Sequence, residues 1–292
     1  MNTTISVLII TKNRPKQLNR CLISLSSQID KPKQIIIIDS SSTNKTKYLI
    51  NRFKAKLPIV YCYYKPLGYP QAYNQAIKLS TNRWLAFLND DCTLPKTWFK
   101  KVKKVVKTHP NSVIQTKVIS LPKHNIYANI MGQHYQNWIK SHLSKNNSLS
   151  TLDLKCSIIP RQLFYHKNQF QGFDLKLTKG SEDIDLGRRF KNQDVQIIYQ
   201  PQINIFHWER TNLKDFIFQH YRIAQSESQL DKNNKFITPL FPKKKTLLNI
   251  HTFFNLFSQY FLNLNLIKAF YLLFLYFALF ATRIIGYNHQ SK

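Results

Sequence analysis

Acidic residues are scarce in this chain, which has 14 Asp and Glu against 43 Lys and Arg and a formal net charge of +29. A surplus of that size indicates an anionic partner, which could be nucleic acid, anionic lipid or a substrate that bears phosphate. Charge alone does not separate these three classes. Because acids are so few, any cluster of them marks a candidate functional site.

Cysteine is also rare, and the four thiols Cys21, Cys62, Cys92 and Cys156 form no C-x-x-C pair. This pattern argues against a disulfide framework and against a zinc site, and it favours buried, reduced thiols. A secretory leader is missing as well, because the apolar run at 5–10 is short and the polar sequence TKNRPKQ follows it. We therefore expect the catalytic part of the chain to stay in the cytoplasm.

Apolar residues are plentiful, at 43% hydrophobic and 13% aromatic over 292 residues, and the sequence shows no internal repeats. That length suits one catalytic domain with an appendage. We expect a catalytic domain at 1–232, with a nucleotide-binding half at about 1–110 and an acceptor half at about 111–232. Basic and aromatic helices are expected at 233–292.

The first hundred residues alternate between strand and helix. Continuous apolar runs predict strands that are covered on both faces, at 5–10, 34–39, 58–64 and 83–88. Helical patterns separate them, one of which begins at a proline and places Leu18, Leu22 and Leu25 on one face. This order predicts an α/β fold with a mostly parallel sheet flanked by helices. Ligands of such sheets bind beyond the carboxyl ends of the strands, where Asp39 and Asp91 lie.

The remainder of the first 232 residues is less regular. Helices are predicted at 97–109, with Trp98 and the valines inward and the lysines outward, and at 213–230. Two short strands are predicted near Gln196–Tyr199 and Ile203–His207, and the polar segment 120–155 gives no clear pattern.

From Pro242 the sequence changes character, with three lysines followed by an aromatic-rich region that reaches Tyr287. Residues 250–264 keep the spacing of an amphipathic helix, and 269–282 form an uncharged apolar run. As a helix this run would extend about 21 Å, against a hydrocarbon core of about 30 Å. We therefore expect it to lie in one leaflet of an anionic membrane rather than to span it.

Two acidic clusters could carry chemistry. FLNDDCTLP (87–95) places carboxylates directly after a buried strand, where they could bind a hard divalent cation, although a turn rich in Asn and Asp gives the same pattern. GSEDIDLGRRF (180–190) contains carboxylates that could act as a general base, although an acidic helix N-terminus gives that pattern too. His207, at a strand end, is structural by default and gains meaning only as a metal ligand beside Asp91.

Taken in order, these segments resemble the inverting family-2 glycosyltransferases of the GT-A fold, from Ser6 to about Trp208. The segments that carry the resemblance are SVLIITKNRPKQLNRCLISL, IIIIDSSSTNKT, GYPQAYNQAI, FLNDDCTLP, GFDLKLTKGSEDIDLGRRF and the strand that ends at His207. The resemblance implies a GT-A fold, a UDP-, dTDP- or GDP-sugar donor, a Mg²⁺ or Mn²⁺ cofactor and a glycan or lipid-linked acceptor.

The resemblance also implies roles for residues on the donor side. Thr11 and Asp39 match positions that contact the base and ribose of the donor, and Asn74 matches an Asn near the donor. The D-x-D motif of the family corresponds to three consecutive residues, Asn89, Asp90 and Asp91. Of these, Asp91 matches the metal ligand, and His207 matches a His that completes metal binding.

On the acceptor side, Asp183 matches the catalytic base, with Glu182 beside it in an "ED" pair. Arg189 matches the Arg of the "DLxxR" tail, and we expect Glu182 and Arg189 to contact substrate. The sequence departs from the family where Asn89 replaces the first Asp of D-x-D, as in members that resemble rhamnosyl- and galactofuranosyltransferases. It also has IDSSST in place of VDDGS.

The expected function is therefore metal-assisted transfer of a hexosyl or deoxyhexosyl group, with inversion, at the cytoplasmic face of the cell membrane. One alternative is a basic nucleic-acid-binding protein, against which stand the absence of a recognised nucleic-acid module and the apolar C-terminal region. The other is an inactive scaffold of the same fold, against which stands the presence of both Asp91 and Asp183. We expect no nucleic-acid partner.

Overall fold

The computed structural model describes residues 3–65, 68–178, 180–232 and 266–291. The chain divides into two compact units. The first consists of Met1–Ile119, His142–Lys176 and Glu182–Trp208, and the second of Ser120–Ser141, Leu177–Ser181 and Glu209–Lys292.

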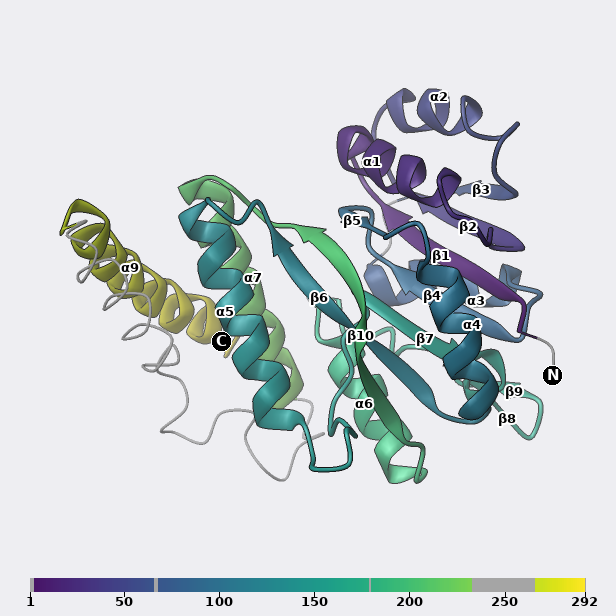
Figure 1. Ribbon diagram of the computed structural model, residues 1–292. Coiled ribbons are helices and arrows are strands. Elements are labelled where there is room, and N and C mark those ends of the chain that lie inside the picture. Colours follow the sequence, from purple (N-terminus) through teal and green to yellow (C-terminus); the bar gives the residue numbers. More distant parts are fainter. Residues whose placement is uncertain (1–2, 66–67, 179, 233–265, 292) are drawn as a thin grey trace. The chain divides into compact units, whose positions relative to one another are not determined.

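The first unit is built on a sheet with the strand order β3-β2-β1-β4-β7-β6-β10-β5. The four strands that the sequence predicts pair in parallel and lie side by side (Figure 1). They are β1 (Ile5–Thr11), β2 (Gln34–Asp39), β3 (Ile59–Tyr63) and β4 (Trp84–Leu88). The α/β class and the parallel first half of the sheet are therefore confirmed.

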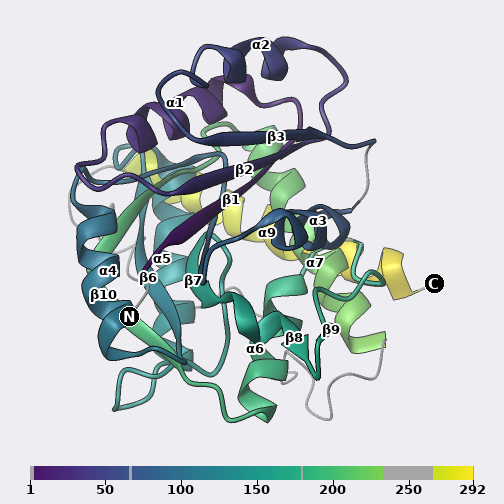
Figure 2. The same cartoon turned by 90° about the vertical axis from the view of Figure 1, so that its right-hand side faces the viewer.

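Helices connect these strands and bury their apolar sides against the sheet. They are α1 (Pro15–Ser26), α2 (Lys45–Asn51) and α3 (Tyr69–Leu79), and Figure 2 shows them around the parallel strands. Pro15 occupies the first turn of α1, where its missing N–H costs no hydrogen bond. Leu18, Leu22 and Leu25 are buried, as their spacing predicts.

The rest of the sheet contains antiparallel pairs, between β4 and β7, β6 and β7, and β10 and β5. These strands are β5 (Cys92–Thr93), β6 (Val113–Leu121), β7 (Cys156–Pro160) and β10 (Ile197–Trp208). The sequence predicts two short strands where the structure has the single strand β10. Pro201 lies between the two predicted strands; it is exposed and lies outside the part of β10 that pairs with β5, at Phe206 and His207.

Two further helices of the first unit are α4 (Trp98–Thr108) and α6 (Glu182–Asn192), with the short elements η1 (Arg161–Phe164), β8 (Tyr165–His166) and β9 (Gln169–Phe170). In α4, Trp98, Val102 and Val106 are buried while most of the lysines are exposed, which confirms the amphipathic helix predicted there.

The second unit contains α5 (Ile126–His142), α7 (Leu213–Lys232) and α9 (Leu266–Ser291). The helix predicted at 213–230 is confirmed as α7, whereas α5 lies in the segment that gave no pattern. All three helices contribute to one apolar core, which consists of Tyr127, Ile130, Phe216, Leu275 and Leu279. The apolar run at 269–282 therefore has a face that is buried within the protein.

The predicted helix at 250–264 and the three lysines at 243–245 lie outside the described residues. Across the ranges that the structure does describe, no helix combines the length and apolar character that crossing a membrane requires.

We expect two histidines, the half-buried His134 and the buried His220, to make the second unit sensitive to acid. His134 and His220 lie with their rings 6.1 Å apart, close to the ion pair of Arg283 and Glu227 at 2.8 Å. Burial, and next the charge of Arg283, lowers the pKa of His134 to about 4, and the same causes together with His134 hold the pKa of His220 well below its ordinary value. The unfolded chain binds these protons near pH 6.5, so this contribution to stability is complete above pH 6.5 and is lost as the pH falls toward 4.

We therefore expect the free energy of unfolding to fall by about 2 kcal/mol for each such histidine between pH 7.5 and pH 5. Thermal melting of the full chain over this range measures the effect. His220→Leu should flatten the pH dependence, whereas the exposed control His166→Leu should not. Identical slopes for His220→Leu and the unchanged chain would rule out His220 as a source of the sensitivity.

Candidate active site

The predicted donor residues lie at the carboxyl ends of three neighbouring parallel strands. Thr11 ends β1 and pairs in register with Asp39, which ends β2. The loop Asn89–Asp91, called the acidic loop below, follows β4. Strand β4 pairs with β1 on the side of β1 that faces away from β2. Since the carboxyl ends of parallel strands share one edge of the sheet, these side chains come from distant parts of the sequence to one place.

Asp39 is buried and held by two hydrogen bonds. Its Oδ1 accepts from the backbone N–H of Ser41 at 2.9 Å, and its Oδ2 accepts from the hydroxyl of Tyr61 at 3.0 Å. Burial and this hydrogen bond raise the pKa of the Tyr61 phenol, which therefore remains a donor. The carboxylate is fixed in orientation at the strand end, as a group that recognises a nucleoside must be.

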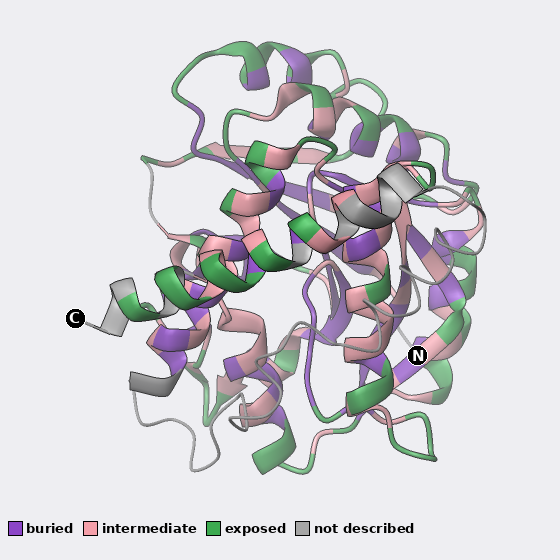
Figure 3. Ribbon diagram, turned by 90° about the vertical axis from the view of Figure 1, so that its left-hand side faces the viewer, coloured by how far each residue is buried: buried purple, intermediate pink, exposed green. Residues whose placement is uncertain are grey.

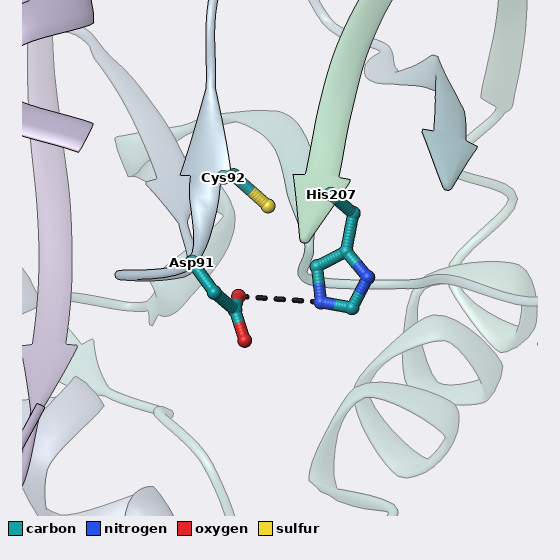
Figure 4. A group of neighbouring side chains, drawn as sticks. All are labelled: Asp91, Cys92 and His207. Atoms are coloured by element: carbon teal, nitrogen blue, oxygen red, sulfur yellow. Dashed lines mark ion pairs between the residues drawn. The ribbon is translucent and has the colours of Figure 1, made fainter. Parts of the chain in front are cut away.

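Asp91 and His207 are brought together by the pairing of β5 with the end of β10. His207 lies opposite Cys92 in this antiparallel pair, and the backbone N–H of Trp208 donates to the carbonyl of Asp91 at 3.0 Å. The His207 ring then points at the Asp91 carboxylate, with Nε2 3.2 Å from Oδ1 (Figure 4). Ligand atoms of Asp91, Cys92 and His207 all lie within 4.8 Å of one another.

This group has the properties of a metal site. Asp91 Oδ1 is buried and faces the His207 ring, and a carboxylate together with an imidazole suits a divalent ion such as Mn²⁺. Burial raises the pKa of the Cys92 thiol well above its ordinary value, and a protonated thiol is a poor ligand. Asp91 and His207, the pair suggested by the resemblance, are therefore the residues that fit a metal.

Arg14 is a site residue that the sequence interpretation missed. Its Nη1 lies 2.8 Å from Asp90 Oδ1 and its Nη2 lies 2.6 Å from Asp91 Oδ2. Burial would raise the pKa of Asp91, but His207 and Arg14 outweigh it and hold that pKa well below its usual range. Asp90 also accepts a hydrogen bond from Thr11 Oγ1 at 2.7 Å. The sequence did contain a signal for this role, because Arg14 follows β1, and β1 is a neighbour of β4, which the acidic loop follows.

Asp183 lies in the first turn of α6, half-buried, and accepts hydrogen bonds from the backbone N–H groups of Ile184, at 2.9 Å, and Leu154. Burial and then the charge of Asp153 raise the pKa of Asp183 to about 6, against the opposing charge of Lys155. A carboxylate tuned toward neutral pH is suited to general-base catalysis. Neither Asp153 nor Lys155 was singled out in the sequence.

The segment beside Asp183 is held firmly in place. Lys155 Nζ lies 3.1 Å from Asp153 Oδ2, and the backbone N–H of Asp153 donates to Gln115 Oε1 at 3.1 Å. Gly187 lets α6 pack against this segment, because a Cβ there would lie 2.7 Å from the backbone N of Leu152.

Asp185 Oδ2 pairs with Arg189 Nε at 3.1 Å, one helical turn apart. Arg189 therefore has a clear role within α6, and its contact with substrate stays a prediction. The same holds for Glu182, which begins the helix beside Asp183.

Asn74 is occupied by the protein backbone. Its Nδ2 donates to the carbonyl of Phe173 at 2.9 Å, and its Oδ1 accepts from the N–H of Phe173 at 2.7 Å. Gly172 permits this clamp, since a Cβ at that position would overlap Asn74 Oδ1. Asn74 thus fixes the segment 172–173, and its contact with the donor stays a prediction.

Two observations relate the acidic loop to the region around Asp183. The phenol of Tyr73 is buried, and its pKa is raised well above the ordinary value by burial and then by the charges of Glu182, Asp183 and Asp90. The half-buried Asn89 donates its backbone N–H to the carbonyl of Lys155 at 3.4 Å. The acidic loop and Asp183 therefore lie in neighbouring parts of the first unit.

Solved structures share this fold at low sequence identity. The mannosyltransferase PcManGT from Pyrobaculum calidifontis, in complex with GDP-Man and Mn²⁺, has a TM-score of 0.59 at 16% identity over 98% of this chain and 74% of that chain. TarS from S. aureus has a TM-score of 0.55 at 16% identity over 87% of this chain, which spans only 49% of TarS.

TarS 1–349 in complex with UDP-GlcNAc has a TM-score of 0.54 at 15% identity over 87% of this chain and 81% of that chain. No curated protein matches the sequence. Residues 6–166, more than half of the chain, match the family described as glycosyl transferase family 2, and they include the β-strands of the donor side and the acidic loop. The chain belongs to glycosyl transferase family 2 and is a glycosyltransferase of the GT-A fold.

Proposed function

We propose that this glycosyltransferase moves a hexosyl or deoxyhexosyl group from a nucleotide-diphosphate donor to a hydroxyl of a glycan or lipid-linked acceptor, with inversion and with Mg²⁺ or Mn²⁺. The observation that carries the proposal is the meeting of Asp91 with His207 in the unit that also holds Asp183. The GDP-Man and Mn²⁺ bound to PcManGT and the UDP-GlcNAc bound to TarS 1–349 support it by analogy.

On the donor side, Asp39 accepts a hydrogen bond from the base or ribose, and Thr11 lies beside it at the end of β1. Asp91 and His207 would hold the metal, whose charge would balance that of the diphosphate leaving group. Asn74 supports this side through the backbone that it clamps.

On the acceptor side, Asp183 takes the proton from the attacking hydroxyl. The hydroxyl oxygen forms its bond to the anomeric carbon while the bond from that carbon to the diphosphate oxygen breaks. Attack from the face opposite the leaving group passes through an oxocarbenium-like state and inverts the anomeric centre. Glu182 and Arg189 lie on the same helix as Asp183 and would contact the substrates.

A scan of UDP-, dTDP- and GDP-sugars tests the proposal and identifies the donor. Purified protein should hydrolyse one of them slowly in the presence of Mn²⁺ or Mg²⁺, and the released nucleoside diphosphate is measured. If none is hydrolysed and none binds with either metal, the proposal is wrong.

We also propose that the enzyme works at the cytoplasmic face of an anionic membrane. One face of α9 packs in the core of the second unit through Leu275 and Leu279. Away from this core, α9 has exposed apolar side chains, namely Phe274, Phe277, Phe280, Ile284 and Ile285. Figure 3 shows the exposed positions along the helix. An apolar helix face on a chain of net charge +29 suits an interface with anionic lipid.

Phe274→Ser combined with Phe277→Ser should weaken binding of the full chain to anionic vesicles by about tenfold or more, because each buried Phe contributes roughly 1.5–3 kcal/mol. Vesicle co-sedimentation measures the loss. Ile29→Ser combined with Tyr48→Ser removes side chains of similar exposure, 67% and 66%, from the first unit and should have no effect. Unchanged binding of the Phe274/Phe277 variant would place the membrane contact elsewhere.

High salt should weaken attachment without abolishing it, because the apolar contact remains after the charges are screened. The substitutions of Phe274 and Phe277 test membrane binding more specifically than truncation of the chain near Pro242. Truncation would also remove Leu275 and Leu279 from the core.

A further inference from the structure

We propose that Arg14 is a placeholder cation, which neutralises Asp90 and Asp91 in the nucleotide-free enzyme and must withdraw when a divalent metal binds. The inference rests on the proposed function for the presence of a metal at Asp91 and His207. It adds a role for a residue outside the acidic loop, namely control of the metal affinity of the resting site.

The geometry of Arg14 is that of a bridge. One guanidinium nitrogen lies 2.8 Å from Asp90 Oδ1 and the other terminal nitrogen lies 2.6 Å from Asp91 Oδ2. The two carboxylate side chains are only 4% and 8% exposed, so both charges have left bulk water. Buried carboxylates without a compensating cation are strongly destabilising, and Arg14 supplies that cation before a ligand arrives.

The same bridge opposes metal binding. Asp91 contacts Arg14 through Oδ2, while Oδ1 faces His207 Nε2 at 3.2 Å, so an ion held by Asp91 and His207 would lie next to the guanidinium. Two like charges so close together in a partly buried site repel one another strongly. A divalent ion and the bridging Arg14 therefore compete for one carboxylate pair.

The position of Arg14 allows its side chain to move away from Asp90 and Asp91. Its side chain is 24% exposed, whereas the two carboxylates that it joins are almost fully buried. Its backbone caps α1, whose start is fixed by Pro15, so the side chain can swing while the helix stays. A donor diphosphate would bring new negative charge to this edge of the sheet, and Arg14 would then have another anion to bind.

The test is Mn²⁺ binding to the full-length, nucleotide-free protein, with free Mn²⁺ quantified by electron paramagnetic resonance. Arg14→Gln should bind Mn²⁺ at least about tenfold more tightly than the unchanged chain, because the competing charge is gone. Lys16→Gln is the matched control, since it removes one charge from an exposed position on the same helix and should leave the affinity unchanged. Arg14→Lys, which keeps the charge but cannot bridge two carboxylates as a planar fork does, should be intermediate.

Thermal melting provides a second readout that does not depend on the spectroscopy. Arg14→Gln should melt lower than the unchanged chain without metal and should gain more from Mn²⁺, because ligand binding to the folded state raises the melting temperature. If Arg14→Gln does not fold, the same comparison is made with Arg14→Lys.

Equal or weaker Mn²⁺ binding by Arg14→Gln would overturn the placeholder role. If that binding is still lost in Asp91→Asn, the proposed metal site stands and only the role of Arg14 is wrong. Absence of Mn²⁺ binding from every form, the unchanged chain included, would overturn the inference together with the metal assignment of the proposed function.

Discussion

Replacing Asp183 by Asn should lower the turnover of sugar transfer by about 10² or more, the usual scale for loss of a general base. The substitution keeps the shape of the side chain and removes only the basic oxygen. Since donor binding is assigned to residues at the ends of β1, β2 and β4, nucleotide affinity should stay close to that of the unchanged chain. Steady-state kinetics with the donor found in the scan, together with nucleotide titration, measure both quantities.

The neighbouring acids provide the controls for this experiment. Asp185→Asn breaks the pair with Arg189 inside α6 and should affect stability more than turnover. Asp194→Asn, at an exposed position just beyond the helix, should leave turnover unchanged. Near-normal transfer by Asp183→Asn, with loss of transfer in Glu182→Gln or Asp185→Asn, would move the base to another residue while leaving the enzyme class intact.

The pKa of Asp183 gives this prediction a pH dependence. The base must be deprotonated to act, and with its pKa raised to about 6 the turnover should fall as the pH drops below about 6. Asp153→Asn removes the like charge that contributes to this rise, so the acid limb of the profile should move to lower pH. A profile that does not move would mean that Asp153 does not tune the base.

Replacing Asp91 by Ala should abolish transfer and donor hydrolysis, because it removes the carboxylate that fits the metal and faces His207. Excess chelator should do the same to the unchanged chain, and added Mn²⁺ or Mg²⁺ should restore only the unchanged chain. Activity assays with and without chelator measure the effect. Full activity in excess chelator would contradict the metal assignment.

Asp30→Ala is the matched control for this loss. The Asp30 side chain is 42% exposed and pairs with Lys103 at 3.4 Å, a surface ion pair that contributes little to stability. In Asp91→Ala, by contrast, Arg14 keeps Asp90 as a partner, so we expect the fold to persist. Circular dichroism of both variants separates loss of chemistry from loss of structure.

The four parallel strands and the helix α4 followed from local sequence pattern alone. Their apolar residues are contiguous or regularly spaced, and burial on one or two faces requires such spacing whatever the distant neighbours are. The position of the acidic loop could also be predicted from the sequence, because the loop directly follows the buried strand β4. Resemblance to the family then suggested roles for Asp91, Asp183 and His207.

Only the tertiary structure decided which of these residues meet. The contact of His207 with Asp91 depends on the register of β5 against β10, which no local pattern encodes. The bridge from Arg14 to the acids and the placement of Asp153 beside Asp183 depend on loops that fold over neighbouring strand ends. The charged partners of each site residue come from distant parts of the sequence. A local sequence pattern indicates only which residues of one segment are buried. For that reason the sequence by itself determined the strands and the candidate acids, and the tertiary structure decided their partners.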